Sequence, residues 1–348
     1  MKPAIFSFLL FLGFGCAPQE NPAADDTAAK EDPQENGVCG EEDPNPFLCN
    51  APWNFAFTLP EELDVTDWEV DTDFWLPGYS VGHLLVLHDG TYRMTLTGNE
   101  QKKYLARSTD GLEWTIDPKP FLDISSYTSE AVQMDLAELY LPDGRYRLMI
   151  IGMTGMGEES ASFILSAISE DGDHWDLEEG IRYEIPKEDG GISSVWSVMW
   201  SDLYQGYLAY YVADFWRVNN IRTAFSEDGF TFVPFTGEGV TPENRGDPCV
   251  TLDGKGGVRI FTVQFILTKE DGSEQVGVEG HFTVFRSDDW ITLEDETDLT
   301  GFERFIDLDT YSDIFDPEVL RLPDGRVEMF FGNDAEGTMG LRRAFLKQ

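Results

Sequence analysis

Three aspartates stand at the same position ahead of three similar hairpin sequences. Asp135 and Asp316 each lie eight residues before the aspartate of an "LPDG" turn, and Asp247 in "GDPCV" has the same register ahead of "DGKGG". Carboxyl groups that converge on one point can act as a general acid and a general base if their pKa values differ. These residues therefore predict acid–base chemistry, provided that the fold brings three distant segments to one place.

Three glutamates are candidates for a further acidic group. Glu318 lies two residues after Asp316, Glu130 lies in "YTSEAV", and Glu279 lies in "GVEGH". None of the three shares the register of the aspartates, so the general acid stays open among them.

The two remaining repeats carry no carboxylate at the equivalent position, where Val81 and either Trp196 or Ser197 stand instead. Aromatic side chains gather around this part of the third repeat, and exposed aromatic rings can stack on a flat ligand. We expect Trp196 and Trp216 to face the site, and we add His83, which follows Val81, as a further candidate for substrate contact.

The aspartates also admit a purely structural interpretation. The carboxylate of an Asp-Pro pair at the start of a strand can cap backbone amides, and proline fits where no ladder donor is needed. Recurrence in three repeats favours this interpretation, because a residue that repeats with the fold usually serves the fold. The sequence leaves both roles open.

A short turn recurs about every sixty residues and shows how the chain is built. Its copies are "STDGLEW", "SEDGDHW" and "SEDGFTF", with "SDDWITL" as a degenerate fourth, and they begin at Ser108, Ser169, Ser226 and Ser287. Each copy follows a β-hairpin pattern such as "YLPDGRYRLMI" and a third strand such as "KYLARS". One repeat thus predicts a four-stranded antiparallel sheet.

Five such sheets in series predict an all-β fold, a five-bladed β-propeller. The chain ends at "LRRAFLKQ", just before the fourth strand of the fifth blade. An open ring would leave a bare sheet edge. We therefore expect "WNFAFTL" or "DWEV", which lie between Trp53 and Trp75, to complete the last blade.

The recurring turn resembles the Asp box of sialidases and related propellers, with Asp110 and Gly111 adjacent in the first copy. In those families the turn sits on the outer rim, so the resemblance implies a role in the fold. The aspartate can accept hydrogen bonds from nearby amides, and glycine accepts a positive φ. We expect Trp114, Trp175 and Phe232, which follow these turns, to pack between blades.

Residues 53–348 resemble the five-bladed glycoside hydrolases, which comprise the arabinanase and β-xylosidase group and the invertase and levansucrase group. The resemblance implies hydrolysis of a glycosidic bond by carboxyl groups from different blades, which need different protonation states. The Asp-Pro of that family's first blade is absent from "GYSVGH". The alternative function is a non-catalytic propeller that binds a glycan or a protein with the same face.

Charge narrows the choice of partners. The 65 acidic residues outnumber the 24 Lys and Arg, and the net charge is -41. Nucleic acid and anionic membrane surfaces are excluded as partners, because no basic surface would offset phosphate repulsion. Carbohydrate is the expected partner, a protein partner is possible, and we expect a monomer. We expect no cofactor and no zinc site, since no zinc spacing is present; a Ca²⁺ ion in the acidic channel stays open, although no loop motif supports it.

The N-terminus predicts export. Residues 1–15 combine Lys2 with an apolar run and resemble a bacterial lipoprotein signal, which makes Cys16 the lipidated first residue. Residues 16–51 are acidic and poor in large apolar side chains, as expected of a flexible tether, and residues 52–348 form the propeller. We expect a disulfide between Cys39 and Cys49, a buried free thiol at Cys249, and a lipid-anchored place in the bacterial cell envelope.

Overall fold

β-strands dominate the part of the chain that the structure describes. The computed structural model describes residues 56–62, 67–98, 102–122, 132–154, 161–187, 193–213, 219–235, 240–267, 276–296, 314–335 and 338–347. All of them belong to one compact unit within residues 38–348. The predicted signal segment, Cys16, the tether, and Cys39 with Cys49 lie outside the described residues and stay predictions.

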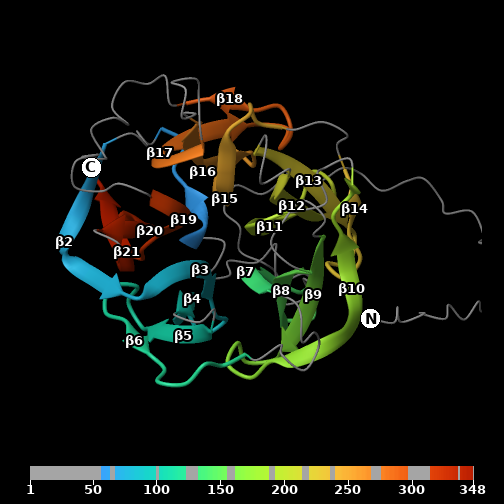
Figure 1. Ribbon diagram of the computed structural model, residues 1–348, viewed down its shortest axis with the longest axis horizontal. Helices are drawn as coiled ribbons and strands as arrows, with labels where there is room; N and C mark the ends of the chain where they lie inside the picture. The colour runs from blue at the N-terminus through green and yellow to red at the C-terminus, as the bar shows by residue number, and fades with distance from the viewer. Residues whose placement is uncertain are drawn as a thin grey trace, which may run out of the picture. The chain divides into compact units, whose positions relative to one another are not determined.

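The strands form five sheets arranged as blades around a central axis (Figure 1). Blade 1 contains β3 (Tyr79–Val86), β4 (Tyr92–Gly98), β5 (Lys103–Ser108) and β6 (Thr115–Ile116). Blade 2 contains β7 (Val132–Tyr140), β8 (Tyr146–Met153), β9 (Ser162–Ser169) and β10 (Asp176–Glu184). Blade 3 contains β11 (Trp196–Ser201), β12 (Gly206–Ala213), β13 (Asn220–Ser226) and β14 (Val233–Pro234).

Blades 4 and 5 complete the ring. Blade 4 contains β15 (Arg245–Asp253), β16 (Val258–Leu267), β17 (Val276–Ser287) and β18 (Glu294–Asp295). Blade 5 contains β19 (Ile314–Arg321), β20 (Val327–Ala335) and β21 (Thr338–Leu346). Figure 1 shows the first strand of each blade nearest the axis, so that β3, β7, β11, β15 and β19 surround a central channel. The predicted five-bladed propeller is confirmed.

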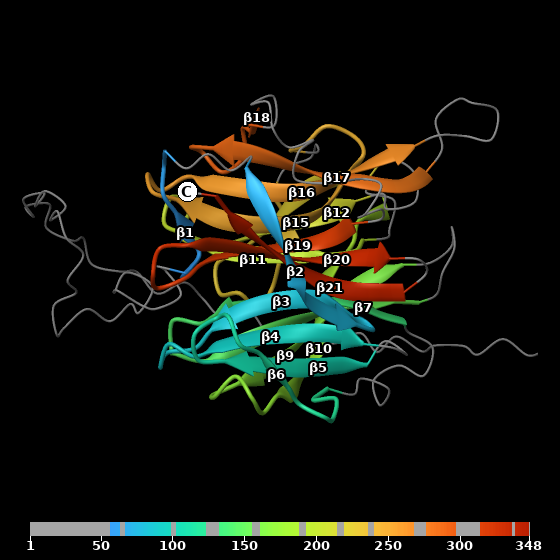
Figure 2. The ribbon, with the colours of Figure 1, turned by 90° about the vertical axis from the view of Figure 1, so that its left-hand side faces the viewer.

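A strand from the N-terminal side closes the last blade. β2 (Trp68–Pro77), which contains "DWEV", pairs antiparallel with β21, and Trp68 stands opposite Leu346. Figures 1 and 2 both show β2 alongside β21. The other expected stretch, "WNFAFTL", provides β1 (Thr58–Leu59), which adds in parallel to β15. The expected closure is confirmed, and it removes the open edge.

The hydrophobic core lies between neighbouring blades. The middle strands are packed on both faces; every residue of β4, β8 and β12 is buried. As expected, Trp114 lies between blades, with its ring 5.6 Å from that of Phe330 in blade 5. Phe232 is buried and meets Trp196 edge to face. Many of the aromatic side chains therefore pack between neighbouring blades.

The recurring turns have the geometry that the sequence predicts. In the first copy Asp110 Oδ1 accepts hydrogen bonds from the backbone N–H groups of Leu112 and Glu113 and from the Ser108 hydroxyl. Gly111 adopts a φ of 79°. The fourth copy differs, because Trp290 stands where the others have glycine and still adopts a φ of 69°.

Arginines link blades 1 and 2 to the recurring turn of the following blade. Arg147 in β8 donates to the backbone carbonyl of Gly229 and also pairs with Glu178. Arg93 in β4 forms an ion pair with the side chain of Asp173, in the turn of blade 2. These arginines therefore belong to the repeat. Within the described ranges, no helix is long and apolar enough to cross a membrane.

Candidate functional site in the central channel

Bulges near the start of the inner strands turn the candidate aspartates out of the regular ladder. The β15–β16 pairing shifts between Gly246 and Cys249, and the β19–β20 pairing shifts between Phe315 and Glu318. Each bulge holds an Asp-Pro pair, and both Asp247 and Asp316 have a φ of 50°. Residues other than glycine rarely adopt this conformation, so the packing around them must enforce it.

The three aspartates meet at this end of the channel, although they come from blades 2, 4 and 5. The backbone N–H of Asp316 donates to Oδ2 of Asp247 at 3.4 Å. Burial and the charge of Asp135 raise the pKa of Asp247 to about 7. Burial, Asp247 and Asp135 together raise the pKa of Asp316 well above its ordinary value. The register argument thus places three interacting carboxyl groups in one site.

A lysine from blade 1 completes this group, which we call the aspartate cluster: Asp135, Asp247, Asp316 and Lys103. Lys103 is fully buried in β5, and its ammonium donates to the Thr97 hydroxyl at 2.7 Å. Burial lowers the pKa of Lys103 to about 8, although Asp135 and Asp316 act in the opposite direction. Burial also raises the pKa of Asp135, and the Lys103 charge opposes that shift. Blade 1, which lacks the aspartate, therefore contributes a cation instead.

Glu318 and His83 form a separate pair further along the channel. Nδ1 of His83 lies 3.2 Å from Oε1 of Glu318, and Glu318 is buried. Burial alone would lower the pKa of His83, but Glu318 and Glu138 together outweigh it and raise that pKa. The partner of the Glu318 carboxylate is therefore His83. The structure shows no hydrogen bond between Glu318 and the three aspartates.

Trp196 is not where the sequence analysis put it. The side chain is 1% exposed and stacks on Tyr211, with ring centroids 5.2 Å apart. β11 and β12 pair in regular register from Trp196 onward, without a bulge that would turn the ring toward the axis. Its place in the core between blades argues against a role in substrate contact. Glu130 and Trp216 lie outside the described residues, as do the side-chain contacts of Glu279, and they stay predictions.

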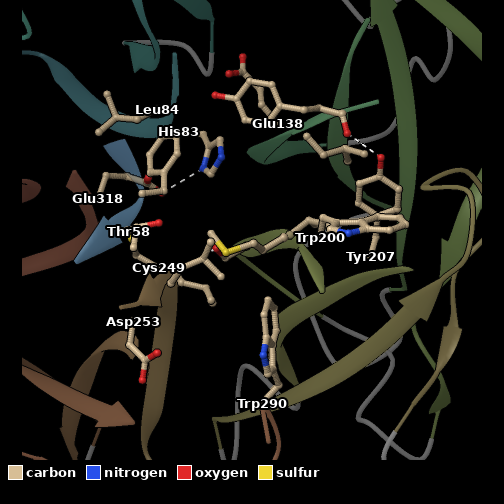
Figure 3. A pocket seen from close by; sticks show the side chains of 18 of the residues that line it. Thr58, His83, Leu84, Glu138, Trp200, Tyr207, Cys249, Asp253, Trp290 and Glu318 are labelled. Atoms are coloured by element: carbon tan, nitrogen blue, oxygen red, sulfur yellow. Dashed lines mark hydrogen bonds and ion pairs between the residues drawn. The ribbon is translucent and has the colours of Figure 1, made fainter. Parts of the chain in front are cut away.

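A cavity of about 300 Å³ occupies the channel beyond the His83–Glu318 pair (Figure 3). It extends from this pair to Asp202 and Gly256, two exposed residues in the turns that follow β11 and β15. The three aspartates are not among its lining residues, so the aspartate cluster and the cavity are separate parts of the channel.

Two of the buried charged residues in this channel escaped the sequence analysis. Lys103 shares a strand face with Leu105, and Glu138 shares one with Leu136; all four side chains are buried. A charged residue in phase with buried apolar residues of an alternating strand is the signal that could have found them. In the described part of the chain, no group of three or more His, Cys, Asp and Glu side chains is arranged to hold a metal ion.

Comparisons with known proteins place this geometry in context. No protein-family model and no curated protein matches the chain. Solved structures do. One of them, a complex of BT0996 and RGII, has a TM-score of 0.60 at 16% identity, and the match covers 82% of this chain and 92% of that protein. A glycosyl hydrolase from Bacteroides ovatus has a TM-score of 0.55 at 14% identity, with coverages of 84% and 94%.

A third similar structure is a thermostable family-43 glycoside hydrolase, with a TM-score of 0.55 at 11% identity over 77% of this chain and 89% of its own. The chain has the propeller fold of these glycoside hydrolases. At such low identity the likeness establishes the fold, and function must be argued from the site.

Proposed function

We propose that this protein is an exported carbohydrate-active propeller that hydrolyses an extracellular glycan at the aspartate cluster. The observation that carries the proposal is the meeting of three carboxyl groups from three blades, in a fold shared with glycoside hydrolases. Glycosidic hydrolysis needs one carboxyl group that is protonated and one that is ionised. Lipidation of Cys16 and a place in the cell envelope are part of the same proposal.

Each carboxyl group has a role that its surroundings favour. Asp316 has two carboxylate neighbours, which raise its pKa, so it would retain a proton and serve as general acid. Burial raises the pKa of Asp135, but the Lys103 ammonium opposes that shift and no carboxylate adds to it, so among the three aspartates Asp135 would be the best suited to act as base or nucleophile. Asp247 accepts the Asp316 N–H and would orient that residue.

One contact favours a second candidate, a propeller that binds a glycan or a protein without catalysis. Asp247 is only 5% exposed, and its hydrogen bond to the backbone of Asp316 joins blades 4 and 5. If this hydrogen bond is the only role of Asp247, the residue holds the two blades together and takes no part in catalysis. The two candidates differ in what removal of a carboxylate does, because a catalytic carboxylate is needed for the rate and a structural one for stability.

The test is hydrolysis of a panel of aryl glycosides and polysaccharides by the full chain, beside the Asp135→Asn and Asp316→Asn variants. We expect sugar release that both substitutions reduce by a factor of at least about 10³ without unfolding the protein. The matched control is Asp143→Asn, which alters an exposed aspartate in the hairpin turn that follows β7. Absence of release from every substrate, together with destabilised variants, would favour the binding propeller.

A further inference from the structure

The channel cavity contains charge that the aspartate cluster does not explain. Four carboxylate residues line it and no lysine or arginine does, among the residues that the structure describes: Glu138, Asp202, Asp253 and Glu318. Two of the four have a cationic partner, since Glu318 meets His83 and Asp253 lies 3.0 Å from the Arg286 guanidinium. An anionic ligand would be repelled from such a cavity.

Glu138 is a cavity carboxyl group without a hydrogen-bond partner. Its side chain is 2% exposed, and neither carboxylate oxygen accepts a hydrogen bond in the structure. A buried polar group without a partner is costly and is rare in folded proteins. Burial raises the pKa of Glu138 to about 8, although the nearby His83 charge opposes the shift. Figure 3 shows Glu138 beside His83 at one side of the cavity.

Three aromatic side chains also line the cavity. They are Trp200, Tyr207 and Trp290, and the polar atom of each ring donates a hydrogen bond to another residue of the protein. The indole N–H of Trp200 donates to Asp202, the Tyr207 hydroxyl donates to the Tyr140 carbonyl, and the indole N–H of Trp290 donates to the Gly256 carbonyl. The faces of such rings attract cations through their quadrupoles.

Trp290 is held in this wall against its backbone preference. Its φ of 69° occurs at the position where Gly111, Gly172 and Gly229 stand in the other three turns. A bulky residue in this conformation is a genuine outlier, and such outliers gather at functional sites. The fourth turn has therefore exchanged a favourable glycine for an indole that closes the cavity.

We propose that this cavity is a second binding site, which takes an organic monocation: an ammonium group on an apolar body, with the ammonium on Glu138 and the body between Trp200, Tyr207 and Trp290. The ammonium would replace the proton of the Glu138 carboxyl group and give its oxygens the hydrogen-bond donor that they lack, and a cavity of about 300 Å³ is at the lower end of the size of small-molecule sites. The exposed Asp202 at the outer end would attract the cation. This site is independent of the proposed hydrolysis.

The test is calorimetric titration of the full chain with phenethylamine, and with 2-phenylethanol and 3-phenylpropanoate as neutral and anionic ligands of similar shape. We expect phenethylamine to bind at least 10-fold more tightly than the alcohol, and the carboxylate to give no binding. Equal affinities for amine and alcohol, or no binding of the amine, would overturn the proposal. Preferred binding of Ca²⁺ with no amine binding would also overturn it.

Two variants and one control locate the site. Glu138→Gln keeps the shape but cannot ionise to pair with the ammonium, so amine affinity should fall at least 10-fold. Trp290→Gly introduces the glycine that the other turns have, and it should lower the affinity for the amine by a similar factor. The matched control is Glu328→Gln, because Glu328 is equally buried and unpartnered but does not line the cavity. An effect of Glu328→Gln as large as that of Glu138→Gln would contradict the assignment.

Discussion

At the scale of single residues, the aspartates could be predicted but much of their environment could not. A hairpin turn fixes the register of its strands, so counting back from "LPDG" placed Asp135 and Asp316 at equivalent points. The positive φ of Asp316 and the arrival of Lys103 from another strand of blade 1 depend on packing between blades. Trp196 was misplaced because an apolar ring suits both the channel and the core, and only the local register decides between them.

The stability of Asp247→Asn distinguishes a catalytic aspartate from a structural one. In the unfolded chain Asp247 loses its proton near its ordinary pKa of 3.8, whereas in the folded protein it keeps the proton up to about pH 7. Folding therefore loses stability as pH rises from about 4 to 7, and the loss persists above that range. Removing the charge should stabilise the protein at pH 8, by up to about 4 kcal/mol, and change little at pH 4.

Thermal unfolding of the wild type and of Asp247→Asn at the two pH values provides this measurement. A variant that is less stable than the wild type at both pH values would show that the carboxylate serves the fold.

At the scale of elements, the repeat carried the prediction. A four-stranded sheet, a Ser-Asp-Gly turn and a closing strand follow from alternation, turn chemistry and the need to cover an edge, which are local rules. The bulges could not be predicted from these local rules, because an Asp-Pro pair in a strand does not show where the register of the ladder shifts. Those bulges decide which inner-strand side chains leave the ladder for the channel.

The recurring turn that begins at Ser108 should contribute to stability and not to the site. Asp110 accepts hydrogen bonds from two backbone amides and from Ser108, and the amides of Glu113 and Leu112 lower its pKa. Asp110→Ala should cost about 1 kcal/mol at pH 7, a value reduced by solvent exposure. Because the pKa is lowered in the folded state, this contribution is present above the ordinary pKa of 3.8 and is lost as pH falls below it.

Urea unfolding at pH 7 and pH 3 measures this difference, and Glu113→Ala, which keeps the backbone donor, is the control. Equal losses for the two variants would show that the Asp110 carboxylate does not hold the turn.

At the scale of the whole molecule, β2 joins the two ends of the propeller. Trp68 is 3% exposed and meets Phe261 of blade 4 edge to face, while Arg343 of β21 pairs with Asp71 across the closure. A chain that begins at residue 52 keeps β1 and β2, whereas one that begins at residue 79 leaves β21 as an open edge.

We expect the first truncation to unfold cooperatively near the temperature of the full chain. The second should aggregate or bind a dye specific for exposed apolar surface, because an unpaired edge strand and its core face are uncovered. Both truncated proteins can be compared by light scattering and thermal unfolding. Equal behaviour of the two truncations would show that closure by β2 is dispensable.

The most direct test of the central claim is the pH dependence of glycan hydrolysis, with the substrate that the panel identifies. If the aspartate cluster catalyses the reaction, kcat/KM should persist through pH 7, because the charge that Asp247 gains there raises the pKa of Asp316 and keeps this general acid protonated. It should fall only at a higher pH, where Asp316 itself loses its proton. Asp135→Asn and Asp316→Asn should lose at least about 10³-fold at every pH, while Asp143→Asn should follow the wild type. Wild-type rates in both cluster variants would contradict the account.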